Sequence, residues 1–313
     1  MSLHGIRSIV VGVPNVQEVA AYYDEFGLRE VSSPGDARRR FATLDGGEQL
    51  AIVGSPQRRL LELALRADDE DDLARIGSQL TALNVAYKRE GASLLTEEPN
   101  SGLTVRVQIT PRLVQAPAAV APTNGPGRPD RPNGRAAAVT RTTRIRPRRL
   151  GHLMVGSLDQ EASHLFFTKG LGFKVTDHIV GLASFLRCSS DHHNVLVQQS
   201  PVSYLHHTAW EVNDVDEVGR GAADMLRGNP ERHIWGMGRH FIGSNFFWYL
   251  RDPAGNYSEY FSDIDCILED QLWKPEVVAD ATREYGWAEP VPPSFLKPDD
   301  LADLMMGNHS PKR

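Results

Sequence analysis

The sequence predicts an α+β fold of four βαβββ modules, paired into two similar domains that each form an open, barrel-like sheet with helices outside. Short apolar runs typical of strands alternate with amphipathic segments typical of helices, in the order strand, helix and three strands. The opening pattern of the chain returns after about 144 residues, which indicates an internal duplication. A stretch rich in proline and arginine, without hydrophobic periodicity, separates the two copies.

The first half of the chain contains the pattern twice. A continuous apolar run predicts the first strand, and the next segment has an asparagine suited to capping and apolar residues at helical spacing. Gly27 ends that helix, and a Gly46–Gly47 pair predicts a turn between two later strands. A second helix has an acidic first turn, which is favourable at a helix amino terminus. The predicted elements are a strand at 6–13, a helix at 15–26, a strand near 28–31, two strands within 41–54, a strand at 60–67, a helix at 69–84 and short strands within 86–109.

The second half repeats this order after the proline-rich stretch, which contains seven of the 20 prolines of the chain and is interpreted as a linker or surface excursion. The segment 150–157, LGHLMVGS, copies the first strand, and 159–172 copies the first helix with its glycine stop. The segment 205–218 parallels 60–73, each a strand that runs into a helix with an acidic first turn. The two halves are therefore expected to share one fold.

Composition excludes several classes of protein. The net charge of −6 gives no basic stripe for nucleic acid. Two cysteines, Cys188 and Cys266, are too few for a disulfide framework or a cysteine metal site, which fits a reducing compartment. No apolar run approaches the roughly 20 residues that cross a bilayer, and the amino terminus lacks the features of a signal peptide. We expect a cytoplasmic protein that binds neither nucleic acid nor membrane.

The stretch 235–263 is predicted to be one β-hairpin with a carboxylate in an aromatic wall. Its turn, Asp252-Pro253-Ala254-Gly255, suits a type I turn that closes on a left-handed glycine bulge. A carboxylate among rings costs several kcal/mol to desolvate, so Glu259 requires a cation or a metal, unless it faces solvent on an amphipathic strand. The turn sets the pairs Asp252 with Asn256, Tyr249 with Glu259, and Phe247 with Phe261.

When the two halves are aligned, the set of two histidines and one carboxylate is found in the second half only. His152 corresponds to Ser8 and His207 to Glu62, and Glu259 falls where the first half ends in QITPRL, without a carboxylate. Two histidines and one carboxylate, each on a strand, are the facial ligand set of a non-haem Fe(II) site. Two alternatives remain at this point: each histidine alone could be an ordinary buried or surface imidazole, and the halves could simply have diverged.

Four motifs carry a resemblance that covers nearly the whole chain. They are LGHLMV around His152, LHHTAWEV around His207, WGMGRH ending at His240, and YLRDPAGNYSEYFSD at 249–263. With them the sequence resembles the two-domain type I extradiol catechol dioxygenases of the vicinal oxygen chelate superfamily. The resemblance implies that His152, His207 and Glu259 bind Fe(II), rather than Mn(II), with His207 chosen over His206 as the second histidine of its pair.

The same resemblance implies further roles. His193 matches an acid/base histidine that takes a proton from the catechol and later returns one. Because His192 is adjacent, the match could instead fall on His192. His240 and Tyr249 match residues that face the catechol oxygens, and Met154 and Phe185 match residues that pack against its ring. The implied domains are a non-catalytic domain at 1–111, a linker at 112–147, a metal-binding catalytic domain at 148–265, and a tail at 266–313 that folds over the site as a lid.

The implied activity is Fe(II)-dependent cleavage of an aromatic catechol with O2 to a yellow 2-hydroxy-6-oxo-dienoate. A bulky substrate such as 2,3-dihydroxybiphenyl is favoured by the apolar FFWYL wall, and Trp235 stands where an arginine would bind the carboxylate of homoprotocatechuate. Two alternatives are a glyoxalase-like metal isomerase and a metal-free binding protein of the antibiotic-sequestering kind. A homo-oligomer is also expected, since oligomers are common in this family.

Overall fold

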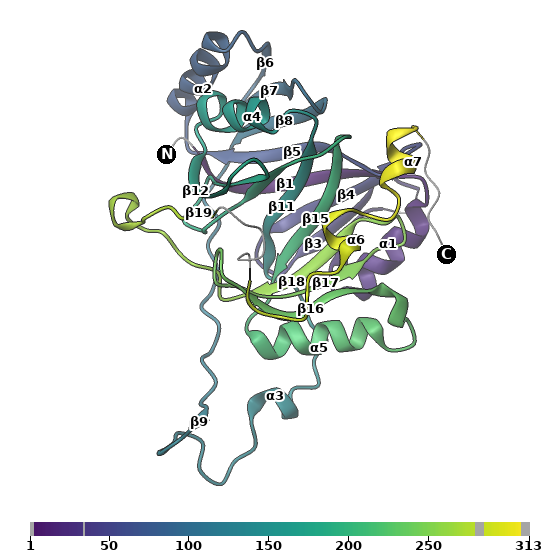
Figure 1. Ribbon diagram of the computed structural model, residues 1–313, viewed down its shortest axis with the longest axis vertical. Coiled ribbons are helices and arrows are strands. Elements are labelled where there is room, and N and C mark those ends of the chain that lie inside the picture. Colours follow the sequence, from purple (N-terminus) through teal and green to yellow (C-terminus); the bar gives the residue numbers. More distant parts are fainter. Residues whose placement is uncertain (1–2, 34, 279–284, 308–313) are drawn as a thin grey trace.

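Two mixed β-sheets, one from each half of the chain, form the body of this computed structural model, which describes residues 3–33, 35–278 and 285–307 (Figure 1). Each half follows the order strand, helix and three strands twice, so the predicted four βαβββ modules are confirmed. The first half contains β1 (Leu3–Val13), α1 (Val16–Glu25), β2 (Arg29–Glu30), β3 (Arg39–Thr43), β4 (Gly47–Gly54), β5 (Arg59–Ala67), α2 (Glu70–Ala82), β6 (Tyr87–Glu90), β7 (Ser93–Glu98) and β8 (Leu103–Ile109). The second contains β11 (Arg149–Ser157), α4 (Gln160–Leu165), β12 (Lys174–Ile179), β13 (Ala183–Arg187), β14 (Val195–Gln199), β15 (Tyr204–Glu211), α5 (Val215–Leu226), β16 (His233–His240), β17 (Phe246–Arg251) and β18 (Tyr257–Ser262).

The two sheets share one strand order. The first is β2-β3-β4-β1-β5-β8-β7-β6, and the second is β12-β13-β14-β11-β15-β18-β17-β16, with β19 (Val277–Val278) and β20 (Tyr285–Trp287) added at its edges. The registers correspond as well, because Val10 lies opposite Glu62 in the first sheet and Met154 lies opposite His207 in the second. The duplication seen in the sequence is therefore present in the pairing of the strands.

The first half supports β18, the strand that carries Glu259, from behind. Alternate residues of a strand point to opposite faces, so Ser258 and Tyr260 face away from Glu259. On that side the hydroxyls of Tyr22 and Ser258 lie 2.5 Å apart, and the ring of Tyr260 stacks on Phe26 with centroids 3.9 Å apart. These buried contacts fix β18 relative to α1.

The stretch 235–263 forms three strands, β16 to β18, so the expectation of a single hairpin is wrong. Gly243 and Ser244 adopt φ values of +88° and +60°, which reverse the chain between β16 and β17. The predicted turn between β17 and β18 is present: Gly255 has a φ of +96° and its N–H donates to the carbonyl of Asp252 at 3.0 Å. The predicted pairs are confirmed for Asp252 with Asn256, Tyr249 with Glu259, and Phe247 with Phe261.

The helix expected at 159–172 is shorter than predicted. Asp159 caps α4 by accepting a hydrogen bond from the N–H of Ala162 at 3.0 Å, but α4 ends at Leu165. A π-helical turn, η1 (Phe166–Gly170), continues the chain to the predicted glycine stop. Within the described residues, the longest helices are too short or too polar to span a bilayer.

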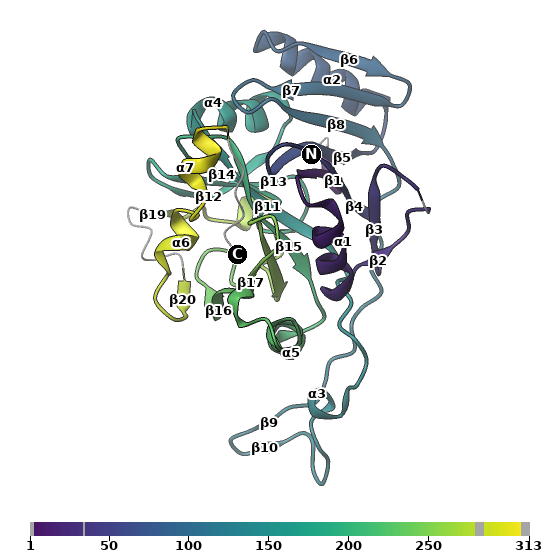
Figure 2. The same cartoon turned by 90° about the vertical axis from the view of Figure 1, so that its right-hand side faces the viewer.

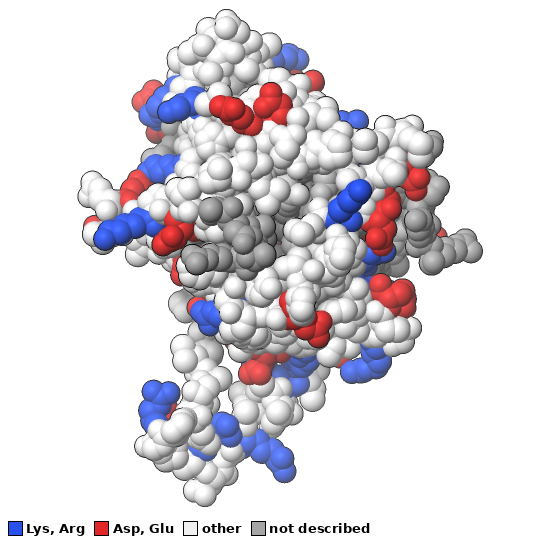
Figure 3. Space-filling model, viewed as in Figure 1, with Lys and Arg blue, Asp and Glu red and all other residues white. Residues whose placement is uncertain are grey.

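The segment 112–147 projects from the body (Figures 1 and 2). It contains only β9 (Asn124–Gly125), β10 (Arg128–Pro129) and α3 (Ala137–Thr140), and none of residues 113–140 is buried. Basic side chains gather on it in the space-filling view (Figure 3). Near its end, Arg141 forms an ion pair with Asp214 at 2.7 Å, which ties the projection to the start of α5.

The carboxyl-terminal segment returns along the second sheet, in yellow in Figure 1. After the 3-10 turn η3 (Asp270–Leu272) it carries α6 (Pro293–Leu296) and α7 (Leu301–Met305). Arg58 of the first half is fully buried and binds both oxygens of Asp300, at 2.6 and 2.8 Å. Residues 279–284 and 308–313 of the predicted tail lie outside the described residues.

Candidate metal centre and active site

Three adjacent strands of the second sheet bring His152, His207 and Glu259 to one face. His152 on β11 lies opposite Ala209 on β15, and Ala209 lies opposite Glu259 on β18. His207 is two residues before Ala209, so its side chain points to the same side of the sheet. The small Ala209 leaves the middle of this row free for the three longer side chains.

The side-chain atoms of these residues converge. Nε2 of His152 lies 3.1 Å from Oε2 of Glu259, and Nε2 of His207 lies 3.8 Å from the same oxygen. The three potential ligand atoms are all within 4.8 Å of one another, and the three residues are buried. The other oxygen of Glu259 accepts a hydrogen bond from Nδ2 of Asn245 at 3.1 Å, which turns Oε2 toward the histidines.

This arrangement fits a divalent metal ion. A buried carboxylate is costly without a positive partner. Burial, together with the neighbouring His206 and His152, holds the pKa of His207 well below its usual range, so this ring is neutral near pH 7 and does not balance Glu259. Two imidazole nitrogens and one carboxylate oxygen on one side of a cation are typical of non-haem Fe(II) sites.

A chain of hydrogen bonds orients His207 from behind. Nε2 of His206 donates to the carbonyl of Phe295 in α6 at 2.6 Å, because a carbonyl only accepts. Burial lowers the pKa of His206 to about 4, so the ring is neutral and its Nδ1 carries no proton. Nδ1 of His207, 2.8 Å away, therefore donates to it and leaves Nε2 of His207 free to bind a metal.

All of the predicted site residues except Glu259 line one small cavity. Its space is about 20 Å³, close to the room for one water, so an aromatic ring enters only if the lining side chains move apart. Nε2 of His240 and the hydroxyl of Tyr249 lie 3.0 Å apart on one side of it. The lining contains the predicted His152, Met154, Phe185, His193, His207, His240 and Tyr249, together with Leu196 and Ile242.

His193, and not its neighbour His192, reaches this cavity. Burial, and then the nearby His152 and His192, hold the pKa of His193 well below its usual range. Its Nδ1 lies 3.0 Å from Nδ1 of His192, and its ring packs against Phe185 with centroids 5.3 Å apart. The nitrogen Nε2 is thus the one that His193 can offer to a bound molecule.

Sequence reasoning missed Leu196 and Ile242 in the cavity wall. Leu196 on β14 lies opposite both Phe185 on β13 and Met154 on β11. It therefore lies between two residues that were predicted to pack against the substrate ring. The order β13-β14-β11 that follows from a βαβββ module would have located Leu196. Ile242 lies in the turn after β16, where the sequence carries no signal for it.

The first half carries an ion pair at the positions of two of the metal ligands. The strand registers make Arg106 the counterpart of Glu259, since Ala64 lies opposite Arg106 as Ala209 lies opposite Glu259. This corrects the expected counterpart at QITPRL, which begins two residues beyond Arg106. Arg106 binds Glu62, the counterpart of His207, at 3.0 Å.

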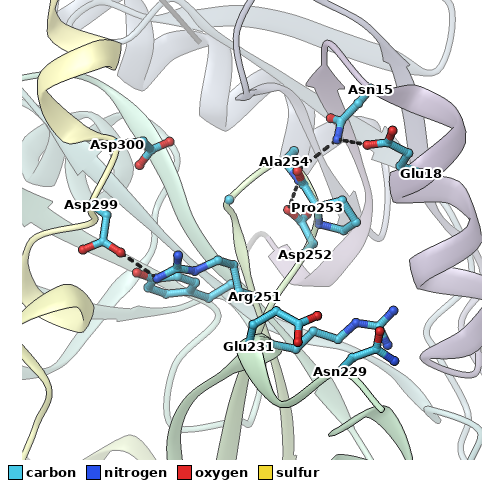
Figure 4. A pocket seen from close by; sticks show the side chains of 13 residues that line it. Asn15, Glu18, Asn229, Glu231, Arg251, Asp252, Pro253, Ala254, Asp299 and Asp300 are labelled. Carbon is cyan, nitrogen blue, oxygen red and sulfur yellow. Dashed lines mark hydrogen bonds and ion pairs between the residues drawn. The ribbon is translucent and has the colours of Figure 1, made fainter. Parts of the chain in front are cut away.

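A larger cavity of about 820 Å³ lies between α1, the turn after β17 and the start of α7 (Figure 4). Several of its charged groups are paired within the chain: Arg251 contacts Asp299 at 3.0 Å, and Nδ2 of Asn15 donates to Glu18 at 2.8 Å. Its lining contains no histidine or cysteine. We therefore assign the chemistry to the smaller, buried site.

Comparisons with known proteins agree with this geometry. The sequence profile of the Glyoxalase/Bleomycin resistance protein/Dioxygenase superfamily matches residues 149–260, which include the three candidate ligands. Metapyrocatechase 2 of Cupriavidus necator is 30% identical over 318 residues, covering 95% of this chain and 92% of that protein. The manganese-dependent 2,3-dihydroxybiphenyl 1,2-dioxygenase of Geobacillus genomosp. 3 is 25% identical and covers 85% of this chain and 87% of its own. The crystal structure of the Mn(II)-bound glyoxalase from Novosphingobium aromaticivorans has the same fold, with a TM-score of 0.75 and 23% identity over 93% of each chain.

Proposed function

Because this chain belongs to the extradiol catechol dioxygenases of the glyoxalase, or vicinal oxygen chelate, superfamily, we propose that it uses Fe(II) to cleave a bulky aromatic catechol such as 2,3-dihydroxybiphenyl. Both atoms of O2 enter the product, a 2-hydroxy-6-oxo-dienoate. The observation that carries the proposal is the meeting of His152, His207 and Glu259, of which the two histidines line a cavity walled by polar and apolar residues.

The chain would hold the metal through Nε2 of His152, Nε2 of His207 and Oε2 of Glu259. Fe(II) held in this way would bind the catechol and O2 and would relay electrons from the catechol to O2. The hydrogen bond from Asn245 to Glu259 keeps one carboxylate oxygen directed at the metal position. Two of the three proposed ligands, Glu259 and His207, are therefore oriented by hydrogen bonds from their neighbours.

The polar residues of the cavity wall would move protons and hold the substrate. Nε2 of His193 is proposed to accept the proton of one catechol hydroxyl and to return a proton later in the reaction. The low pKa of His193 keeps the ring neutral, and so able to accept a proton, before substrate binds. Tyr249 and His240, 3.0 Å from each other, would hydrogen-bond the oxygen edge of the catechol.

The preference for a bulky catechol is supported by the apolar part of the wall. Met154, Phe185, Leu196 and Ile242 belong to one buried apolar cluster and line the cavity. Apolar side chains of this kind bind an aromatic ring by removing it from water. None of these four residues offers a charge to a substrate carboxylate, so a neutral catechol is favoured.

The metal is proposed to be Fe(II) rather than Mn(II). Histidine and carboxylate donors accept both ions, so the ligand set alone does not separate them. One relative is named an iron-dependent extradiol dioxygenase and another a manganese-dependent dihydroxybiphenyl dioxygenase. The measured metal content of protein purified without oxygen, followed by reconstitution with each ion, decides between them.

The test of the function is an anaerobic metal assay followed by a panel of catechols. Iron-replete protein should convert 2,3-dihydroxybiphenyl to a yellow product, with smaller alkyl-catechols as weaker substrates. His193→Phe should keep its iron and lose turnover, whereas His164→Gln, a half-buried histidine that bonds Ser184 outside the cavity, should keep both. If no catechol is opened by iron-replete protein, the proposed function is wrong.

We propose in addition that the chain forms a homo-oligomer. Leu268 and Leu272 lie between β18 and β19, Val277 is the first residue of β19, and the three side chains are 84%, 75% and 67% exposed. Several large apolar side chains in one exposed segment are typical of a surface that another protein covers. Light scattering on the eluting protein, with and without aspartate at Leu268 and Leu272, tests this; a monomer would exclude it.

A further inference from the structure

A buried carboxylate and imidazole lie behind His193 and have no part in the reaction proposed above. Oδ2 of Asp177 lies 2.9 Å from Nε2 of His192, and Nδ1 of His192 lies 3.0 Å from Nδ1 of His193. The three residues are 3%, 0% and 4% exposed. They form a continuous line from β12 to the cavity.

The far end of this line is held by the segment after β18. The second oxygen of Asp177 accepts a hydrogen bond from the backbone N–H of Glu276 at 2.7 Å. The ring of Trp273 meets His192 edge to face with centroids 5.2 Å apart, and its Nε1 donates to the carbonyl of Thr176 at 3.1 Å. Asp177 and His192 therefore have little freedom to turn.

The donor and acceptor roles along the line can be assigned by starting from the carboxylate of Asp177. A carboxylate only accepts, so Nε2 of His192 carries a proton. When His192 carries this one proton, its Nδ1 is an acceptor and receives the proton on Nδ1 of His193. Nε2 of His193, which meets the cavity, is left with a free lone pair. The line thus selects the form of His193 that can accept a proton.

We propose that Asp177 and His192 are positioning residues that fix the ring plane and the tautomer of His193, so that Nε2 of His193 meets the substrate as a proton acceptor. This inference rests on the proposed role of His193. His192 and Asp177 do not line the cavity, so they act through His193 and not on the substrate itself.

Asp177→Asn separates this role from a merely structural one. The N–H of Glu276 requires an acceptor, so the amide oxygen of the new side chain faces Glu276 and its NH2 group faces His192. Nε2 of His192 must then accept, its Nδ1 must donate, and Nδ1 of His193 becomes the acceptor. The nearly isosteric change would preserve packing while it reverses every proton along the line, leaving Nε2 of His193 protonated.

The kinetic experiment compares Asp177→Asn with wild type and with His178→Gln, a change at the next residue of β12 that removes a hydrogen bond to Ser184 outside the line. For iron-loaded Asp177→Asn we expect kcat for the catechol to fall about 10- to 100-fold, with KM and iron content within about twofold of wild type. His178→Gln should match wild type. Full activity of Asp177→Asn, with wild type active, would overturn the inference and leave the proposed function intact.

The second measurement is independent of turnover. In the full chain loaded with diamagnetic Zn(II) and labelled with ring-¹⁵N histidine, the wild-type His193 signals should show a protonated Nδ1 and a bare Nε2. In Asp177→Asn the signals of His193 should instead show a bare Nδ1 and a protonated Nε2. A protonated Nε2 in wild type would overturn the inference even if the variant fails to fold. If no catechol is opened by wild type, the proposed function fails, while this measurement still decides the tautomer.

Discussion

Replacement of His206 by leucine should weaken metal binding although His206 is not a ligand. His206 connects Nδ1 of His207 to the carbonyl of Phe295 through hydrogen bonds of 2.8 and 2.6 Å. Leucine fills most of the same volume but accepts no hydrogen bond. The variant therefore leaves the Nδ1–H donor of His207 buried without its partner, and the choice of tautomer that exposes Nε2 is lost.

The expected loss of metal affinity in His206→Leu follows from the unsatisfied Nδ1–H donor of His207. A buried donor left unsatisfied costs about 1–3 kcal/mol, and loss of such an outer hydrogen bond commonly lowers metal affinity about 10- to 100-fold. Competition between the metal-free protein and a chromophoric chelator for Zn(II) or Fe(II), without oxygen, measures the dissociation constant. His206→Leu should raise that constant by this factor, and His206→Gln, which keeps a donor and an acceptor, should raise it less.

His164→Gln is the matched control, because His164 bonds Ser184 at 2.9 Å and lies away from the ligands. Its metal affinity should equal that of wild type. Circular dichroism and thermal unfolding of the metal-free proteins show whether each variant is folded. A folded His206→Leu that binds metal as tightly as wild type would refute the argument that this histidine pair sets the tautomer of His207.

Three further outcomes are expected. Glu259→Gln should lose metal binding by more than 100-fold in the chelator assay, since it removes the only negative ligand; retained affinity would place the metal elsewhere. Arg58→Met should lower the free energy of unfolding, measured in urea, by about 3–5 kcal/mol. The change leaves the carboxylate of Asp300 and neighbouring carbonyls without their buried donor. A decrease below about 1 kcal/mol would contradict this. Burial raises the pKa of Asp252 from its ordinary value of 3.8 to about 6, so its stabilising contribution is full below pH 3.8 and is lost as pH rises through 6. The stability of wild type relative to Asp252→Asn should therefore fall by about 2 kcal/mol between pH 4.5 and 7.5, and an increase would mean that the three N–H donors around Asp252 favour the ionised form.

The parts of the site that could be predicted are those fixed by local rules. The sequence Asp252 to Gly255 determines a turn of known length, and that length sets the register that puts Tyr249 opposite Glu259. The internal duplication supplied the second rule, because it aligned the strands that carry His152 and His207. Both steps need only neighbouring residues or a comparison of the chain with itself.

The residues that escaped prediction depend on contacts between distant segments. Asp177 meets His192 only because β12 and the turn before β14 lie side by side, and no spacing in the sequence announces that pair. Phe295 reaches His206 because the tail returns over the second sheet. The single hairpin expected at 235–263 failed for a local reason, since Gly243 and Ser244 form a second turn that the stronger turn at Gly255 obscured.

The two halves place a carboxylate on the same face of equivalent sheets, but they give it different partners. In the first half, Glu62 and Arg106 occupy the positions of His207 and Glu259, and the carboxylate is balanced by a guanidinium 3.0 Å away. In the second half the carboxylate of Glu259 faces two imidazoles in place of a guanidinium, with Nε2 of His152 at 3.1 Å and Nε2 of His207 at 3.8 Å. Glu62 and Arg106 are each 25% exposed, so water also stabilises their charges, whereas Glu259 is fully buried and needs a cation, which a metal ion can supply. Both halves keep this row of residues, but the second half has histidines in place of Ser8 and Glu62 and a carboxylate in place of Arg106.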